Sequence, residues 1–421
     1  RNNSLDSTSY SLTGSYDKDD EAQAITITYG HSKDHRPDLK QVVQELLVSQ
    51  DGGVPLWMKT HDGNASDSVI FRERATALVE EFNHSDAPRY LIADSKLYTK
   101  KAAVTLAQLA FITRIPGTLT LEQSCVQAAL EQPQAWQALS PTYRYQRVDH
   151  RHYGIDQRWL VIYSDGAYQR AEATLLKAQH KERERLDKAV MHLQAQRFSS
   201  QEQALTALEA VTQTARYHRL EGHEMIAHKR YAGQGRPTAN TPVKAIEWQL
   251  HARFIADEPR LDALRQTRAC FIIATNIPDS ELDDHEVFQT YKAQSSVEHG
   301  FRFLKDPLFF VTSLFLKKPS RSQSLLMVMT LSLLVYTRAP RRLRRQLALT
   351  DETLPNQIGV PTATPTLRWV FQMLEGIHRV VIPQNSAVQT LIHAMTPLRE
   401  KILRLFGKTV CQKYQISWAS G

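Results

Sequence analysis

The stretch RYLIAD, residues 89–94, is a short apolar run that ends in a carboxylate. A carboxylate within or at the end of a buried strand is costly unless it is paired or bound to a metal. Asp6 has a similar setting, because it lies in the otherwise uncharged strand pattern SLDSTSYSL, residues 4–12. Taken alone, each aspartate is more often a turn or cap residue. Together, Asp6 and Asp94 are candidate functional side chains if the fold brings their strands side by side.

Strand and helix patterns alternate around these two aspartates. Alternating or β-branched runs predict strands, and apolar residues at helical spacing predict helices. The predicted order is strand 3–12, strand 22–30, strand 52–60, helix 66–82, strand 89–94, helix 99–110 and strand 111–116. Consecutive strands can form an antiparallel meander, whereas strands reached through helices run parallel to a neighbour. The sequence therefore predicts an α/β fold with a ribonuclease-H-like mixed five-stranded sheet flanked by helices. In that order the first and fourth strands are neighbours, so the two aspartates converge.

A change of character near residue 140 predicts that this sheet domain is interrupted. Long, charged helical runs follow, AGQGRPTANTP at 232–242 is typical of a linker, and a strand pattern resumes at 270–277. The interpretation of the charged run that assigns it no function is a solvated helical hairpin. The expected domains are the first part of the ribonuclease-H-like domain at 1–139, a mainly helical insertion at 140–265, the rest of the domain at 266–310 and a basic, helical C-terminal region at 311–421.

Composition narrows the class of partner. The 421 residues carry a net charge of +8 with a pI near 9.2, which favours a polyanionic partner, most often nucleic acid. The three cysteines are far apart, so neither a disulfide framework nor a zinc knuckle is indicated, and a reducing compartment fits. The apolar run at 324–337 is too short to cross a bilayer and predicts a buried helix. The chain starts without an initiator Met or targeting segment, which suggests a fragment that lacks an N-terminal region.

A basic segment follows that apolar run. Residues 307–350 contain no Asp or Glu. The arginines there that are candidates for neutralising DNA phosphates are Arg321, Arg341, Arg342, Arg344 and Arg345. The alternative is a solvated basic helix end.

The stretch YKAQSSVEHGFRFLK, residues 291–305, is predicted to be one helix with two faces. At 100° per residue, its polar arc holds Tyr291, Gln294, Glu298, Arg302 and Lys305. The neighbouring arc of Val297, Phe301 and Leu304 is expected to dock on the sheet. Phosphodiester cleavage by in-line displacement can use two Mg²⁺ ions held by about three carboxylates from separate elements. Glu298 is therefore the third candidate carboxylate, with Arg302 and Lys305 placed for phosphate oxygens.

This stretch resembles the signature Tyr-(2)-Arg-(3)-Glu-(6)-Lys of DDE transposases in the insertion-sequence-four superfamily. Tyr291, Glu298 and Lys305 match it in type and spacing. LDSTSY and LIADSKLYT look like the strands that carry the family's two aspartates, and GHSKDHRPDLKQ (30–41), DGNASD (62–67) and FITRIP (111–116) look like its recurrent segments. Gln294 stands where the family has Arg. Gln can hydrogen-bond a phosphate but cannot neutralise it.

The resemblance implies a function and a site. Asp6, Asp94 and Glu298 would be the catalytic triad that binds two Mg²⁺ ions, which Mn²⁺ can replace, while Tyr291 and Lys305 would contact phosphates. The enzyme would cleave DNA at transposon ends and transfer the freed strand to target DNA, as a homodimer in a prokaryotic cytoplasm, associated with the nucleoid and not with a membrane. Two alternatives stay open: a structure-specific nuclease of the same fold, and a non-catalytic DNA-binding remnant.

Two tryptophans and one polar segment are weaker functional candidates. The family's insertion can carry a Trp that stacks on a flipped base, for which Trp159 and Trp248 are candidates, although core packing fits both better. In HSKDHRPDLKQ, the residues His31, Asp34 and His35 could bind a metal. A polar loop over DNA or an interlocked structural turn is the preferred interpretation of that segment.

Overall fold

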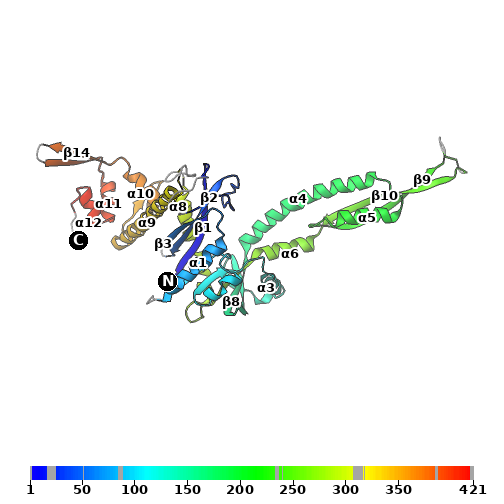
Figure 1. Ribbon diagram of the computed structural model, residues 1–421, viewed down its shortest axis with the longest axis horizontal. Coiled ribbons are helices and arrows are strands. Elements are labelled where there is room, and N and C mark those ends of the chain that lie inside the picture. Colours follow the sequence, from blue (N-terminus) through cyan, green and yellow to red (C-terminus); the bar gives the residue numbers. More distant parts are fainter. Residues whose placement is uncertain are drawn as a thin grey trace. The chain divides into compact units, whose positions relative to one another are not determined.

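The chain divides into two compact units in a computed structural model (Figure 1). Unit 1 comprises residues 1–114, 151–157 and 275–421, and unit 2 comprises 115–150 and 158–274. The structure describes residues 2–16, 25–50, 52–83, 89–232, 237–238, 240–306, 316, 318–384 and 387–417.

Unit 1 is built on a mixed sheet. Its strands are β1 (Asn2–Leu12), β2 (Lys40–Ser49), β3 (Pro55–His61), β4 (Tyr90–Ala93) and β5 (Ala110–Arg114). They lie in the order β3-β2-β1-β4-β5, with β1 antiparallel to β2 and β2 antiparallel to β3. The strand β4 runs parallel to both β1 and β5. The expected α/β fold class is therefore confirmed, and the first and fourth strands are neighbours as expected.

The second strand corrects the sequence prediction. The strand predicted at 22–30 is not the second strand of the sheet: its residues 22–24 lie outside the described part, and of the rest only Thr28 forms an isolated bridge, with Gln41. The second strand is β2, which is buried along almost its whole length. A strand buried on both faces lacks the alternation of polar and apolar residues by which a half-buried strand is recognised.

Helices flank the sheet of unit 1. They are α1 (Asp67–Asn83), η1 (Lys100–Ala102), α2 (Ala103–Leu106), α7 (Asp284–Lys292), α8 (Ser295–Leu304) and α9 (Pro319–Thr350). The single helix predicted at 291–305 is two helices, which is a correction. At the break, Gln294 N–H donates to Tyr291 O at 3.2 Å and Val297 N–H donates to Gln294 O at 3.1 Å, so three-residue turns replace the four-residue spacing.

The apolar face of α8 docks on the sheet, as predicted. Val297, Phe301 and Leu304 are buried in one cluster with side chains of β1, β2 and α9, among them Tyr10 and Leu46. Burial of such side chains contributes roughly 1.5–3 kcal/mol each relative to exposure. This packing fixes the position of α8 over β1.

The C-terminal part of unit 1 is helical with two small hairpins. Its elements are β12 (Leu354–Pro355), β13 (Pro361–Thr362), α10 (Leu367–Leu374), β14 (His378–Gln384), β15 (Ala387–His393), α11 (Pro397–Leu405) and α12 (Lys408–Lys413). The apolar run 324–337 lies in α9 and is buried on one face only: Met329 and Leu333 are buried, whereas Val328 and Val335 are exposed. In the part of the chain that the structure describes, no helix combines the length and apolar character needed to cross a membrane.

Unit 2 contains helices and strands in similar measure, so the expected mainly helical character of 140–265 needs correction. Its elements are α3 (Thr120–Leu130), η2 (Pro133–Ala135), β6 (Gln137–Ser140), β7 (Tyr143–His152), β8 (Ile155–Ser164), α4 (Asp165–Ala195), α5 (Gln201–Thr212), β9 (His218–Tyr231), β10 (Val243–Ala256), α6 (Glu258–Ala269) and β11 (Cys270–Thr275), with residues 151–157 assigned to unit 1.

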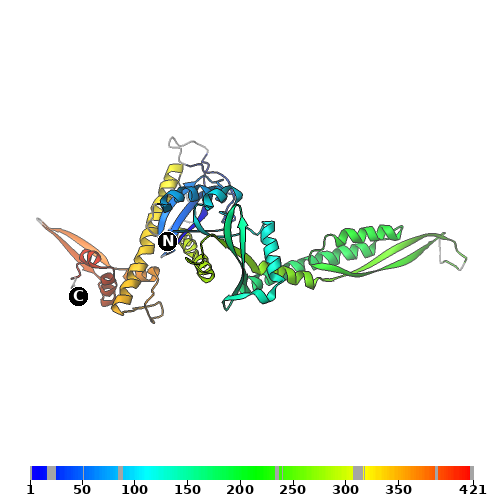
Figure 2. The same cartoon turned by 90° about the horizontal axis from the view of Figure 1, so that it is seen from below.

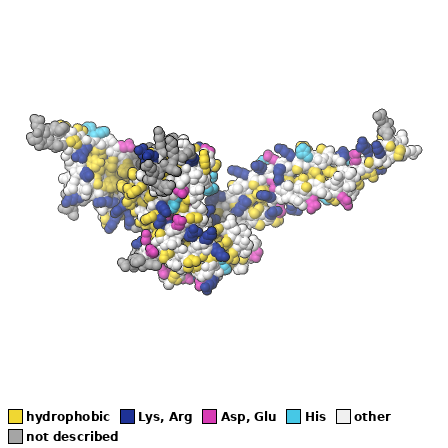
Figure 3. All heavy atoms as spheres, viewed as in Figure 1, with side chains coloured by type: hydrophobic (Ala, Val, Ile, Leu, Met, Phe, Trp, Pro, Cys, Tyr) yellow, Lys and Arg dark blue, Asp and Glu magenta, His cyan; other side chains and the backbone are white. Residues whose placement is uncertain are grey.

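The strands β9 and β10 form a long antiparallel ribbon beside α4 and α5 (Figure 2). The segment 232–242, predicted to be a linker, connects these two strands. One face of the ribbon packs on the helices through Leu250 and Phe254, which explains why polar strands form there. Lys and Arg side chains are scattered along this segment in Figure 3. Trp159 is fully buried and Trp248 packs against the same cluster as Leu250, so core packing is confirmed for both.

Candidate active site

Asp6 and Asp94 are brought together by the register of two parallel strands. Leu5 of β1 pairs with Ala93 of β4; Asp6 is the next residue of β1, and Asp94 directly follows the end of β4. Thr113 of β5 donates from its Oγ1 to Asp94 O at 2.9 Å, which holds the end of β4 against the next strand. Backbone N–H groups orient both carboxylates: Ser7 N–H donates to Asp6 Oδ1 at 2.7 Å and Lys96 N–H donates to Asp94 Oδ1 at 2.8 Å.

Both carboxyl groups are hard to ionise in this position. Burial raises the pKa of Asp6 from 3.8 to about 6, against the lowering effect of Lys33, and the charges of Asp94 and Asp67 add to the rise. Burial also raises the pKa of Asp94, with the charge of Asp67 acting in the same direction. Two like charges in a partly buried place favour binding of a cation.

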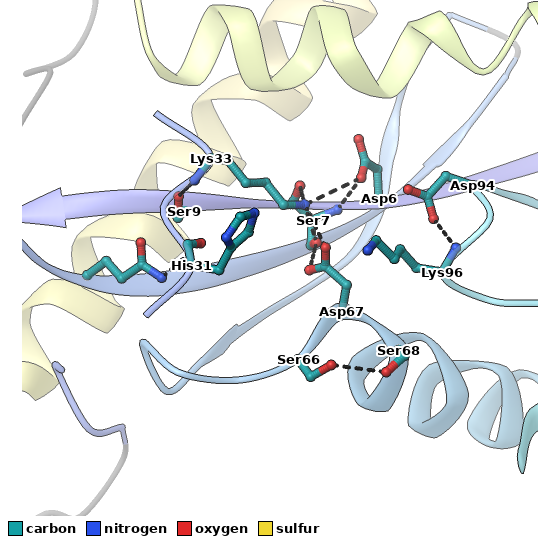
Figure 4. A network of polar contacts seen from close by, with 11 residues as sticks. Asp6, Ser7, Ser9, His31, Lys33, Ser66, Asp67, Ser68, Asp94 and Lys96 are labelled. Atoms are coloured by element: carbon teal, nitrogen blue, oxygen red, sulfur yellow. Dashed lines mark hydrogen bonds and ion pairs between the residues drawn. The ribbon is translucent and has the colours of Figure 1, made fainter. Parts of the chain in front are cut away.

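Lys33 reaches into this acidic cluster (Figure 4). Its Nζ donates to Ser7 O at 2.6 Å and to Ser7 Oγ at 2.8 Å, and it lies 3.2 Å from Asp67 Oδ2 and 4.0 Å from Asp6 Oδ1. The Ser7 hydroxyl donates in turn to Asp67 Oδ1 at 2.5 Å. Lys33 is thus a positive charge provided by the chain itself, next to Asp6.

Sequence reasoning missed both Lys33 and Asp67 as members of the site. Asp67 is the first residue of α1, which made it look like a helix cap. The available signal was that both residues lie in the recurrent segments GHSKDHRPDLKQ and DGNASD. These segments fold against each other, so residues far apart in the sequence meet beside β1.

The two segments interlock through glycines. A Cβ on Gly63 would lie 2.1 Å from Gln41 O and 2.4 Å from Thr28 O, and one on Gly30 would lie 2.0 Å from Gly63 O. The Gln41 side chain donates to Gly63 O at 2.7 Å. Of the two interpretations preferred for HSKDHRPDLKQ, a polar loop over DNA or an interlocked structural turn, this packing supports the structural turn. Asp34, one of the three residues weighed as a metal site, pairs with Lys305 instead.

Glu298 is exposed on the first turn of α8, and Tyr291 lies near the end of the preceding helix, α7. Tyr291 is only 8% exposed. Burial raises the pKa of Tyr291, a hydrogen bond with the Gln294 side chain and the charge of Arg114 lower it, and the charges of Asp94 and Glu298 raise it. The Tyr291 hydroxyl is therefore within electrostatic reach of both Asp94 and Glu298, and Gln294 has a partner inside the protein.

Lys305 and Arg302 have different surroundings. Lys305 follows the end of α8, bonds to Asp34 at 2.7 and 2.9 Å, and lies 5.4 Å from the centre of the Tyr10 ring. Arg302 is exposed, one turn after Glu298 on the same helix. Residues four apart lie on one helix face, so Glu298 and Arg302 present a carboxylate and a guanidinium side by side.

The arginines predicted to bind phosphates are all exposed, but they do not form one patch. Arg321 lies at the start of α9, and the other four lie near its C-terminal half. Arg341 lies near Gly52, Arg342 lies against Gly407, and Arg344 lines a cavity beside α8. The helical spacing of RAPRRLRRQL spreads these side chains around α9, which the count of charges alone does not reveal.

Within the residues that the structure describes, no group of three or more His, Cys, Asp or Glu side chains is close enough to hold one ion. The oxygen donors nevertheless suit a hard cation, because Asp6 and Asp94 are adjacent carboxylates in a partly buried place.

A mixed sheet with adjacent aspartates on its central parallel strands defines a ribonuclease-H-like α/β protein. Residues 4–335 match the family described as the transposase DDE domain, so the chain belongs to this family. Comparison with curated proteins found no match. The family consists of transposases, which are nuclease/transferase enzymes of DNA recombination, act on DNA and generally use divalent metal ions.

Proposed function

We propose that this chain cleaves DNA at transposon ends in a Mg²⁺-dependent reaction and transfers the freed strand to target DNA. The observation that carries the proposal is the Leu5–Ala93 register, which sets Asp6 beside Asp94. Glu298 on α8 is proposed as the third carboxylate, and the reach of its charge to Tyr291 supports that assignment. Two Mg²⁺ ions, or Mn²⁺ in their place, would be held by these three residues.

Each side chain has a proposed task. When bound, the metal would supply Lewis acidity to the phosphodiester. Asp6, Asp94 and Glu298 would bind it, and Lys33 would balance the charge of Asp6 and Asp67. Lys305 and Arg302 would contact phosphate oxygens, and Tyr291, held by Gln294, would orient the strand. Lys305 must leave Asp34 to do this; such exposed pairs contribute only about 0–1 kcal/mol, so a phosphate can replace the carboxylate.

We also assign the chain to the insertion-sequence-four superfamily. The assignment is supported by Tyr291, Glu298 and Lys305 at the signature spacing, and Gln294 is the departure from it. The active form is proposed to be a homodimer, so that two DNA ends are handled together. The side-chain hydrogen bond between Gln294 and Tyr291 offers a structural role for the residue that replaces the family's Arg.

The test is cleavage of DNA that contains the transposon end, with and without Mg²⁺. The variants Asp6→Asn, Asp94→Asn and Glu298→Gln should each lower the cleavage rate by about a thousandfold or more, because each removes several kcal/mol of charge stabilisation. Binding of the same DNA should change little, and Asp262→Asn, an exposed carboxylate of α6, serves as the matched control. Near-normal cleavage by Glu298→Gln would refute its assignment. Integration products, and not nicks alone, would separate a transposase from a structure-specific nuclease.

A further inference from the structure

A cavity of about 600 Å³ lies in unit 1 beside α8, α9 and α10. The helices α8 and α10 both pack against α9, α8 through one hydrophobic cluster and α10 through another, so α9 holds the three walls together. The helix α8 contributes His299, Arg302 and Asp306 just beyond its end, α9 contributes Arg344, and α10 contributes Arg368. A cavity of this size is within the range of pockets that bind small molecules or parts of polymers.

The cavity is strongly cationic. Three arginines line it, and Asp306 is the one acidic residue among the lining residues that the structure describes. Asp306 Oδ2 lies 3.9 Å from Arg368 Nη1, and both side chains are partly exposed at 31% and 50%. A separation of that length between exposed groups leaves Arg368 available to another anion. The surplus of guanidinium groups suits phosphate oxygens, which arginine binds in a bidentate manner.

One wall of the cavity is aromatic. Phe303 and Tyr336 stack with their ring centres 4.0 Å apart and their planes at 22°. Burial raises the pKa of Tyr336, the charge of Arg368 lowers it and the charge of Asp306 raises it, which places both charged groups near the phenol. An apolar wall beside fixed cations matches a sugar-phosphate strand better than a small inorganic anion, because a strand also has apolar sugar edges to cover.

The location links the cavity to the proposed active site. His299 is the residue after Glu298, and Arg302 is one helical turn further along α8. Two arginines predicted from the sequence to contact DNA, Arg302 and Arg344, both line this cavity, although they come from different helices. A strand whose scissile phosphate lies at Glu298 therefore meets Arg302 within about one helical turn, roughly 5.4 Å.

From these observations we infer that the cavity is a binding site for the DNA phosphate backbone next to the cleaved bond, with Arg368 and Arg344 as its anchors and Asp306 as an opposing charge. The inference rests on the proposed function, because it takes DNA as the ligand. It adds His299, Tyr336 and Arg368 to the residues that face the strand, and it assigns α10 a role in binding DNA.

The test measures binding of a short fluorescent duplex to the full chain without divalent metal, so that cleavage plays no part. Arg368→Ala should weaken binding and lower the slope of log affinity against log salt by about one, the value for one lost phosphate contact. Arg368→Lys, which keeps the charge, should recover most of the affinity and of the slope. Arg379→Ala, an exposed arginine on β14, is the matched control and should bind as the parent does.

Asp306→Asn gives the sharper result, because it should bind DNA more tightly, whereas damage to the fold would weaken binding. Unchanged or weaker binding by Asp306→Asn, or an unchanged salt slope in Arg368→Ala, would overturn the inference. The inference would also be overturned if Arg368→Ala abolished binding of inorganic phosphate but left DNA binding unchanged. Failure of the active-site assignment would show differently, as cleavage that survives Asp6→Asn with these binding results intact.

Discussion

Asp94 follows Ala93, which pairs with Leu5 across the parallel strands β4 and β1, and Asp6 follows Leu5. The two aspartates are therefore neighbours. Neither position is available to a carboxylate without cost, since burial raises the pKa of both side chains. The fold therefore maintains an unfavourable juxtaposition of two acids. Natural proteins retain such arrangements at functional sites, where the charged groups bind a ligand or take part in catalysis.

Replacing Asp6 by Asn should stabilise the metal-free protein at neutral pH. The folded pKa of about 6 lies above the ordinary value of 3.8, so the unfolded chain ionises first and stability is lost as the pH rises from about 4 to about 6. Asp6→Asn removes this loss, on the order of 2 kcal/mol at pH 7, and has little effect near pH 3. Denaturant unfolding at the two pH values measures it, with Asp262→Asn as control. Equal effects at both pH values would contradict the role of Asp6 ionisation.

Lys33 should set the pH at which the site becomes active. Its ammonium group lowers the pKa of Asp6 and of Asp94, so Lys33→Gln should move the rising limb of the cleavage–pH profile upward by about one unit. Lys33→Arg retains the positive charge, so it should shift the rising limb of the cleavage–pH profile less than Lys33→Gln does. Lys59→Gln, an exposed lysine on β3, should leave the profile in place. If Lys33→Gln lowers the cleavage rate at every pH but does not shift the profile along the pH axis, Lys33 acts in another way.

The buried ion network beneath α1 should dominate local stability. Glu45 is 1% exposed and pairs with Arg74 at 2.5 Å and with His61 at 2.8 Å. Burial alone would raise the pKa of Glu45, but hydrogen bonds from His61 and Arg74 hold it below its ordinary value. Arg74→Ala leaves a buried carboxylate with a single partner and should cost about 3–5 kcal/mol of unfolding free energy. Arg72→Ala, two residues earlier on α1, should cost far less.

The Glu45 network also has a pH signature. Because the folded pKa of Glu45 is lowered, its contribution is complete above the unfolded pKa and is lost as the pH falls through the folded value. The difference in stability between the parent and Glu45→Gln should therefore shrink in acid. A difference that stays constant from neutral to acidic pH would argue that packing, not charge, sustains the network.

Gly63→Ala should be far more damaging than Gly222→Ala. A Cβ on Gly63 would overlap two backbone oxygens, whereas nothing lies within 4 Å of one on Gly222. Backbone cannot move aside as a side chain can, so Gly63→Ala should lower the midpoint of thermal unfolding by several degrees or more. Gly222→Ala should shift it little. Since Gly63 belongs to the segment that carries Asp67, cleavage should fall with it; full activity in Gly63→Ala would separate the interlock from the site.

Local patterns in the sequence were sufficient for part of this fold. Asp6 and Asp94 stood out because each is a carboxylate in an apolar or uncharged strand, and the order of strands and helices was enough to make those strands neighbours. The apolar arc of α8 was also predictable, since helical periodicity identifies which side of a helix is buried. These features depend on residues close together in the chain.

Other features depend on contacts between distant residues, which periodicity does not register. The strand β2 is buried on both faces, so it lacks alternation. The contacts of Lys33 with Ser7 and Asp67 arise only after two loops interlock around Gly63. The β9–β10 ribbon is stabilised by packing on the apolar faces of α4 and α5, contacts that the pattern of the strands alone does not show. The roles assigned to Glu298, Tyr291 and Lys305 stay predictions.

The chain leaves unit 1 after Arg114 and, apart from residues 151–157, returns only at Thr275. A ribosome therefore makes Asp6 and Asp94 long before it makes Glu298, the residue that we propose as the third carboxylate. Closing so long a loop costs only slightly more entropy than closing a short one, so the finished protein loses little by it. A nascent or prematurely ended chain, however, would carry an incomplete acid set. For the proposed triad, the interruption thus delays assembly of the full set of carboxylates until most of the polypeptide exists.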